Sequence, residues 1–395
     1  MRRITADYIF PVSSAPIKNG IVEVDDYGTI INIIDTAGKP TESAYLEHYN
    51  GVLVPGFVNA HCHLELSVYK QFPFEAEGLP AFIKKIVSSR NQPEEMQLKA
   101  IVDADAEMCN NGIVAVGDIS NNSLSFETKQ RSTIDYYTFV EVFKMGSNDI
   151  ADTIKGGHKL VSQAHDLSLK ASIVPHAPYT VTPNLYKAIQ AAYQSENLVY
   201  SIHNQETPSE DAMYIDQSGD LVNLFQSWGS DMSIFPTTGK SSLQSTASFF
   251  PEGHNKLLIH NTFSTEHDFS FIKSWLRNTF LVLCPNSNLI IEKQLPNIPA
   301  MLNAGLCMAL GTDSYASNHQ LSVLSEMLTI HEHFPTISFQ SLLQMATLNG
   351  AKALKVDHCF GRLEIGMKPG LNLITNFDYQ TSNITKKSNV KVLLP

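Results

Sequence analysis

Short apolar runs alternate with helical segments along most of this chain. Eight such runs cover residues 53–60, 113–117, 136–142, 171–175, 199–203, 256–260, 280–284 and 306–311. Runs of this length that alternate with helices are typical of βα units around a parallel sheet. Eight parallel strands within about 300 residues predict an α/β fold, the (β/α)8 or TIM barrel.

The two ends of the chain have a different pattern. Residues 20–28 and 29–34 are typical of short strands separated by turns, and so are residues 371–375 and 390–394. We therefore expect strands from the two ends to pair. Residues 207–255 lack a strong periodic signal and are rich in Ser, Gly and Asp, so we expect loops there, over the open end of the barrel.

Composition narrows the class of partner. The 395-residue chain has a formal net charge of −11 and no cluster of Lys and Arg, which argues against nucleic acid or a membrane surface and favours a small molecule. The N-terminal residues lack the apolar core of a secretory signal, and no apolar run is long enough to span a membrane. The five cysteines form no CxxC pair, which fits a reducing compartment. A cytoplasmic protein is the expectation.

His61 and His63 lie one residue apart at the end of the first apolar run. Residues i and i+2 of a strand point to the same face, so both imidazoles can bind one ion, while Cys62 faces away as a small core residue. His331 and His333 have the same spacing but lie in a segment of helical periodicity, where i and i+2 residues diverge, so we expect them on a helix surface. Taken alone, the first pair fits metal ligation and a structural polar role equally well.

Four further predicted strands end close to a residue that can bind a metal or transfer a proton. These residues are His176, His203, His260 and Asp313. A single histidine after a strand is usually structural, but the strand ends of a barrel meet at one mouth, and five such ends are hard to explain by core packing. Three imidazoles and one carboxylate predict a site for one divalent ion of the zinc or ferrous type, with water at the open position. The ligands would be His61, His63, His203 and Asp313.

The end of the fourth strand bears on the number of ions. Two-metal barrels of this type usually bridge their ions with a carbamylated lysine there, but this chain has His176, and Lys170 lies at the opposite end of the strand. One ion is the expectation. Glu206 follows His203 by three residues, where it could act as a general acid and base, the alternative being a solvated loop carboxylate.

In their order, these segments resemble the amidohydrolase superfamily, and within it the aminohydrolase and chlorohydrolase branch that includes adenosine, S-adenosylhomocysteine, guanine and aminodeoxyfutalosine deaminases. The resemblance runs almost end to end. It rests on the motifs Pro-Gly-Phe-Val-Asn-Ala-His-Cys-His (55–63), Pro-His-Ala-Pro-Tyr-Thr (175–180), His-Asn-Gln-Glu (203–206), His260, Cys-Pro-Asn-Ser-Asn (284–288), Gly-Thr-Asp-Ser (311–314) and Ala-Thr-Leu-Asn-Gly-Ala (346–351). It implies a metal-dependent hydrolase barrel, residues 55–359, and a small β-sandwich domain formed by residues 1–54 and 360–395. Subunits of the family commonly pair, so a homodimer is compatible with it.

The resemblance also implies roles for the polar residues. One zinc ion, with iron as the alternative, is held by the four ligands named above, and His260 and Asp313 orient and deprotonate its water. Glu206 protonates a ring nitrogen and His176 contacts the substrate. Glu65 could hydrogen-bond a substrate hydroxyl or form a structural ion pair, and the sequence leaves both open.

The expected reaction is the hydrolysis of the exocyclic amine of a purine-like base or adenine nucleoside. The carbon of N=C–NH2 is a poor electrophile until its ring nitrogen is protonated, and the amine must gain a proton to leave as ammonia, so one carboxylate transfers protons twice. Residues 63–67 and 311–318 look most like the aminodeoxyfutalosine deaminase group. The alternatives are a chlorohydrolase or amidohydrolase with the same barrel, and a binding protein with a degenerate site. Glu206 favours deamination, because a chloride leaving group needs no proton, and the presence of all four ligands argues against degeneration.

Overall fold

Two parallel four-stranded sheets form the centre of the molecule. The computed structural model describes residues 1–395 except 43–44, 72–76, 90, 147–148 and 194–197. One central sheet has the order β6 (Phe57–Cys62), β7 (Ile113–Ser120), β8 (Asp135–Val142) and β9 (Lys170–Pro175). The other has the order β10 (Val199–Asn204), β11 (Asn255–His260), β12 (Thr279–Leu283) and β13 (Met308–Leu310). Each of the eight predicted apolar runs overlaps one of these strands, so the strand prediction is confirmed.

The two sheets meet at both edges, close to the carboxyl ends of their strands. At one edge the backbone N–H of His203 donates to the carbonyl of His176 over 2.9 Å. At the other edge the backbone N–H of Asp313 donates to the carbonyl of His61 over 3.1 Å. Gly311 allows this second approach, since a Cβ there would lie 2.8 Å from that of His61. Among the described residues, no continuous eight-stranded ladder of hydrogen bonds occurs. The barrel prediction is therefore confirmed only in part: the structure has two parallel four-stranded sheets in a mixed α/β fold.

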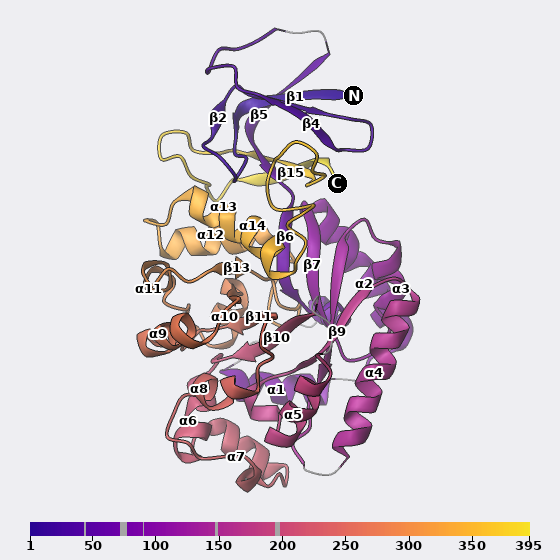
Figure 1. Cartoon of the computed structure of the whole chain (residues 1–395), viewed down its shortest axis with the longest axis vertical. Coiled ribbons are helices and arrows are strands. Elements are labelled where there is room, and N and C mark those ends of the chain that lie inside the picture. Colours follow the sequence, from indigo (N-terminus) through magenta and orange to yellow (C-terminus); the bar gives the residue numbers. More distant parts are fainter. Residues whose placement is uncertain (43–44, 72–76, 90, 147–148, 194–197) are drawn as a thin grey trace.

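Strands from both ends of the chain form a third sheet of seven strands. Its order is β15 (Asn389–Leu394), β14 (Leu371–Thr375), β5 (Leu46–Pro55), β1 (Arg2–Ile9), β3 (Ile21–Val24) and β4 (Ile30–Ile34), with β2 (Ile17–Lys18) paired to β1. The antiparallel pairing of β14 with β5 confirms that the two ends pair. The expected sandwich takes the form of one hydrogen-bonded sheet, which lies at one end of the molecule (Figure 1).

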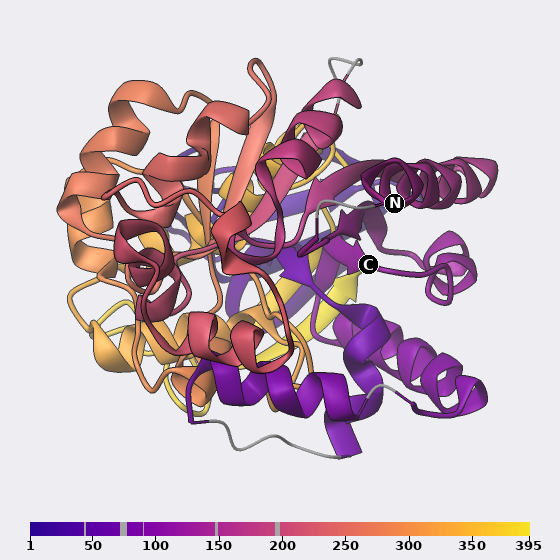
Figure 2. The same ribbon diagram turned by 90° about the horizontal axis from the view of Figure 1, so that it is seen from below.

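Helices surround the central sheets, as the view in Figure 2 shows. They are α1 (Leu79–Ser88), α2 (Glu94–Asn110), α3 (Phe126–Arg131), α4 (Ile150–Asp166), α5 (Pro183–Ala191), α9 (Glu266–Trp275), α10 (Pro285–Ile291), α11 (Ile298–Asn303), α12 (Val323–His333), α13 (Phe339–Ala346) and α14 (Leu348–Ala353). Several begin after a Ser or Thr whose oxygen accepts the N–H three residues on, as Thr265 does before α9. His331 and His333 lie in the last turn of α12, as predicted, with His333 exposed.

The expectation of loops over residues 207–255 was wrong. This stretch contains α6 (Pro208–Asp216), α7 (Asp220–Ser227), η3 (Met232–Ile234), α8 (Ser242–Thr246) and η4 (Ala247–Phe249). These helices are too short for a helical period to be visible in the sequence. Buried apolar side chains hold them in place. Met213, Leu221 and Phe225 pack in one apolar cluster with Leu79 of α1. Figure 1 shows α1, α6, α7 and α8 at the end of the molecule opposite the terminal sheet.

Within the described part of the chain, no helix has both the length and the hydropathy of a membrane span.

Candidate metal centre

Four side chains meet where the two central sheets join. Nε2 of His61 lies 3.1 Å from Nε2 of His63, which lies 3.3 Å from Nε2 of His203. Oδ1 of Asp313 lies 3.5 Å from the ring of His61 and 3.4 Å from that of His63. All four residues are buried. The sequence prediction brought these four residues together, and the structure does so too.

The spacing of these four atoms fits a single metal ion. Ligands about 2.1 Å from a zinc ion at tetrahedral angles lie about 3.4 Å from one another. The four separations of 3.1, 3.3, 3.4 and 3.5 Å match those edges. Three nitrogens and one carboxylate oxygen are ligands that zinc and ferrous ions both accept. The site therefore fits one divalent ion.

The protonation states suit ligation as well. Burial lowers the pKa of His203 to about 4, with further lowering from His176 and His61, and burial and His61 hold the pKa of His63 well below its usual value. Neutral imidazoles keep the lone pair that a metal needs. Burial alone would raise the pKa of Asp313, but its contacts with His61, His63 and His260 outweigh burial and hold that pKa well below its usual value.

Neighbouring groups hold two of these candidate ligands in orientation. Oδ2 of Asp313 accepts hydrogen bonds from the hydroxyls of Ser287 (2.7 Å) and Ser317 (2.5 Å), which leaves Oδ1 facing the histidines. Nδ1 of His203 donates to the backbone carbonyl of His176 over 2.9 Å, which leaves its Nε2 for the metal. Ser287 lies in the quoted motif 284–288, but nothing in the sequence indicated its partner.

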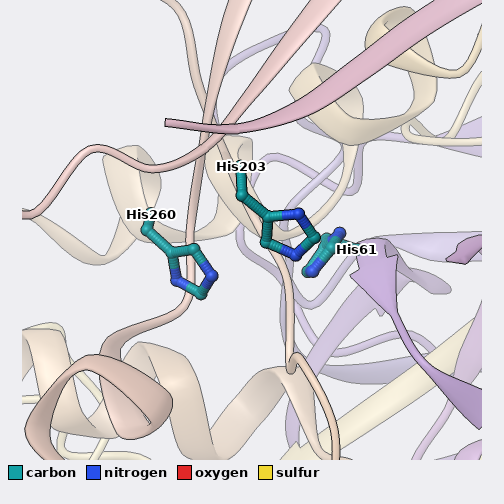
Figure 3. A group of neighbouring side chains, drawn as sticks. All are labelled: His61, His203 and His260. Carbon is teal, nitrogen blue, oxygen red and sulfur yellow. The ribbon is translucent and has the colours of Figure 1, made fainter. Parts of the chain in front are cut away.

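His260 and Glu206 lie beside the four ligands. The rings of His61, His203 and His260 each offer a nitrogen within 4.8 Å of the others, and they come from three strands (Figure 3). Nε2 of His260 is 3.5 Å from Oε1 of Glu206, and its Nδ1 is 3.1 Å from Nδ2 of Asn288. Glu206 is 3% exposed, which excludes the solvated alternative. Burial and the charges of Asp313, Glu210 and Glu292 raise its pKa well above normal.

The two predicted substrate contacts lie at the edge of this centre. The ring centroid of His176 is 4.9 Å from that of His203, and its Nδ1 is 2.8 Å from the hydroxyl of Thr180. Glu65 is buried, its oxygens accept the N–H of Asn121 (3.0 and 3.1 Å), and burial raises its pKa to about 8. Within the described residues Glu65 has no ion pair, which argues against the structural ion pair that the sequence left open for this residue.

Sequence reasoning missed Glu141. It lies in β8, 7% exposed, with Oε1 3.7 Å from Nδ1 of His203 and Oε2 accepting from Asn121 over 3.1 Å. Glu141, His176 and His203 could form a second ligand group, but Nδ1 of His203 is already bonded to a carbonyl and its Nε2 faces the first site. An acidic residue inside an apolar run was the signal that could have found it.

Comparisons with known proteins show the family of the chain. The profile of the Amidohydrolase family matches residues 52–393. The chain is 28% identical over 360 residues to an adenosine deaminase of Helicobacter pylori, covering 89% of this chain and 84% of that one. It is 25% identical over 386 residues to an aminodeoxyfutalosine deaminase of Nitratiruptor, covering 94% and 91%.

Solved structures show the same fold. The crystal structure of Helicobacter pylori aminofutalosine deaminase with methylthio-coformycin superposes with a TM-score of 0.81 at 23% identity, over 97% of this chain and 94% of that one. Atrazine chlorohydrolase from Arthrobacter aurescens, with zinc, superposes with a TM-score of 0.76 at 15% identity, over 99% and 94%.

Proposed function

The chain belongs to the amidohydrolase family, and from this premise we propose that it is a metal-dependent deaminase of adenine nucleosides. The observation that carries the proposal is the buried carboxyl group of Glu206 beside a centre of three histidines and one aspartate. Relatives named as deaminases of adenosine, methylthioadenosine, S-adenosylhomocysteine and aminodeoxyfutalosine support this substrate class. The reaction is hydrolysis of a C–N bond with release of ammonia.

His61, His63, His203 and Asp313 would hold the ion, and zinc is the metal we propose, with iron as the alternative. When bound, such an ion lowers the pKa of water to about 7 and so supplies hydroxide at neutral pH. The orientation of Asp313 by Ser287 and Ser317 fits a ligand that binds through one oxygen. Because Nδ1 of His260 faces the Nδ2 donor of Asn288, the proton of the neutral ring lies on Nε2, which faces Glu206 and can donate a hydrogen bond to the attacking oxygen.

Glu206 supplies the protons. The raised pKa favours the protonated form of Glu206, which can then donate its proton to the ring nitrogen next to the reacting carbon. The resulting carboxylate then takes one proton from the attacking water and passes it to the departing amine, and the second proton of that water returns to Glu206 as the carbonyl forms. His176 and Glu65 would contact the nucleoside from the rim of the centre, Glu65 through a sugar hydroxyl.

We also propose the finer architecture expected for this activity. The two four-stranded sheets would act as one (β/α)8 barrel over residues 55–359, since backbone hydrogen bonds join them at both edges. Residues 1–54 and 360–395 would form the second domain. The carboxyl ends of all eight strands would then face one mouth, where reactions occur in barrels of this kind.

The test is ammonia release from a panel of compounds. Purified protein should contain about one zinc or iron ion per chain, and it should release ammonia from at least one of adenosine, 5′-deoxyadenosine, 5′-methylthioadenosine, S-adenosylhomocysteine and aminodeoxyfutalosine. Metal-replete protein that is inert toward all of them would contradict the proposal. Chloride release from a chlorinated triazine would favour the second candidate, a chlorohydrolase, which the similarity to atrazine chlorohydrolase raises.

A further inference from the structure

The segment that carries Glu206 leaves its strand in a strained backbone conformation. Gln205, the residue before it, has φ of +47°, in the left-handed region. That region is disfavoured for a residue with a side chain, because its Cβ comes too close to the following carbonyl oxygen. Such a conformation persists only where the surroundings impose it, so other groups must hold this backbone in place.

Glu210 makes the contacts that hold it. Its side chain is 0% exposed in the first turn of α6. Oε1 accepts the backbone N–H of Gln205 over 2.8 Å and the hydroxyl of Ser242 over 2.7 Å, and Oε2 faces the backbone N–H of Glu206 at 3.4 Å. One buried carboxyl group therefore binds two successive N–H groups, those of the strained residue and of the proposed proton donor.

These contacts differ from ordinary helix capping. An acidic residue at the third position of a helix usually accepts the N–H of the capping residue, which for α6 is Thr207. The oxygens of Glu210 reach one and two residues further back, to Glu206 and Gln205. The contact thus serves the segment after β10 rather than the end of the helix.

The side chain of Gln205 extends the same support to the neighbouring strand end. Its Nε2 donates to the carboxylates of Asp211 and Asp268, both over 3.1 Å, and its Oε1 accepts from the hydroxyl of Ser264. Its backbone carbonyl accepts the N–H of Phe263 over 3.0 Å. The segments that carry Glu206 and His260 are therefore fixed relative to each other.

We propose that Glu210 is a positioning residue for catalysis: by holding the backbone of Gln205 and Glu206, it sets the Glu206 carboxyl group against His260 and the metal centre. The inference rests on the proposed function. Glu210 itself touches neither the metal ligands nor the reacting atoms, so its loss should reduce kcat without changing metal content or KM. Misplacement of a catalytic group by about 1 Å can cost on the order of 10²-fold in rate.

The experiment compares Glu210→Ala with Glu210→Gln and with Ser242→Ala as the matched control. Ser242→Ala removes one hydrogen bond from the same carboxyl group but leaves those to Gln205 and Glu206. Below the unfolding temperature of every variant, Glu210→Ala should lose kcat by at least about tenfold with zinc content and KM unchanged. Glu210→Gln, whose amide oxygen can still bind the N–H of Gln205, should recover part of the loss, and Ser242→Ala should keep kcat.

Three results would overturn the proposal. They are wild-type kcat in Glu210→Ala, a rise in KM with kcat unchanged, and an equal loss of kcat in Ser242→Ala. If Glu210→Ala does not fold, Glu210→Gln decides, since an unchanged kcat there is also contrary.

A crystal structure of Glu210→Gln or Glu210→Ala gives a readout that needs no substrate. We expect the Glu206 carboxyl group to move away from His260 in the variant, and an unmoved Glu206 would overturn the inference even if the enzyme proved to have another substrate. Failure of the wild-type protein to release ammonia would instead count against the proposed function.

Discussion

Glu206 carries the proton transfers in the proposed reaction, so its removal should separate metal binding from turnover. In Glu206→Gln the amide keeps the shape of the side chain but can neither give nor take a proton. We predict a fall in kcat of about 10²–10⁴-fold, the usual contribution of general acid–base catalysis. Zinc content should stay at the wild-type level, because Glu206 is not among the four ligands. Ammonia release and elemental analysis on the same sample check this, and a variant with wild-type kcat would remove Glu206 from the mechanism.

The charge of Glu292 should shift the pH profile through Glu206. Burial and the charges of Asp313, Glu210 and Glu292 raise the pKa of Glu206, so kcat/KM should fall at alkaline pH as Glu206 loses its proton. Glu292→Gln removes one negative charge, which makes ionisation of Glu206 easier and lowers its pKa. The alkaline limb should therefore move to lower pH. The positive charge of the bound ion lowers the pKa in both proteins and does not change this direction. A limb that stays in place or moves to higher pH would contradict the coupling.

At the residue scale the sequence indicated the four candidate ligands, which the structure brings together, but it did not indicate the groups that support them. His61, His63, His203 and Asp313 were recognised because each lies at or shortly after the end of a buried strand, and strand ends converge in a predictable way. Glu141 and Glu210 were missed because their partners are a ring nitrogen and backbone N–H groups, which no spacing along the chain reveals.

Among the elements, α3 is fixed to the strands by a fully buried ion pair. Nζ of Lys129 lies 2.6 Å from Oδ2 of Asp118 in β7, and both side chains are 0% exposed. The other carboxylate oxygen accepts the N–H of Leu64, the residue after the proposed ligand His63, over 2.7 Å. The pair thus links a helix on the outside to the chain segment at the metal centre.

Breaking this pair on one side should be costly. Lys129→Met leaves the charge of Asp118 buried and unpaired, and we predict a loss of about 3–5 kcal/mol in the free energy of unfolding. Asp118→Asn combined with Lys129→Met should recover part of that loss, because no unpaired charge remains. Urea unfolding of the three proteins measures both effects. A loss below about 1 kcal/mol in the single variant would mean that the pair lies in a solvated site.

Strands were predicted correctly where most residues of a segment are buried. Helices were missed where only some residues of a short segment are buried. The eight buried strands were found because each is a short run of mainly apolar residues. The helices α6 and α7 were taken for loops because eight or nine residues contain too few turns to show a period among Ser, Gly and Asp.

For the whole molecule, the terminal sheet and the central strands meet at Gly112. Its φ is +74°, and its carbonyl accepts hydrogen bonds from the backbone of Phe57 and from Nδ2 of Asn372, both over 2.8 Å. A Cβ at this position would lie 2.4 Å from the side chain of Asn372 in β14. The junction between the proposed domains therefore has no room for a methyl group.

Gly112→Ala should destabilise the protein more than a matched substitution elsewhere. Gly253 has nearly the same φ, +76°, but a Cβ there would have no heavy atom within 4 Å, so Gly253→Ala reports the backbone strain alone. We expect the control to lose about 1–2 kcal/mol in the free energy of unfolding. Gly112→Ala should lose about 1–3 kcal/mol more, because its methyl group clashes with Asn372. Equal losses of stability in the two variants, measured by thermal unfolding, would show that the structure around Gly112 can rearrange to fit a methyl group.

The most direct test of a single catalytic metal centre is a metal titration of the metal-free protein. Zinc is added in steps, with ferrous iron in parallel, and ammonia release from the best adenine nucleoside is measured at each step. We predict that activity rises from zero and levels off sharply at one ion per chain. Activity without metal, or a break at two ions per chain, would contradict a single centre formed by His61, His63, His203 and Asp313.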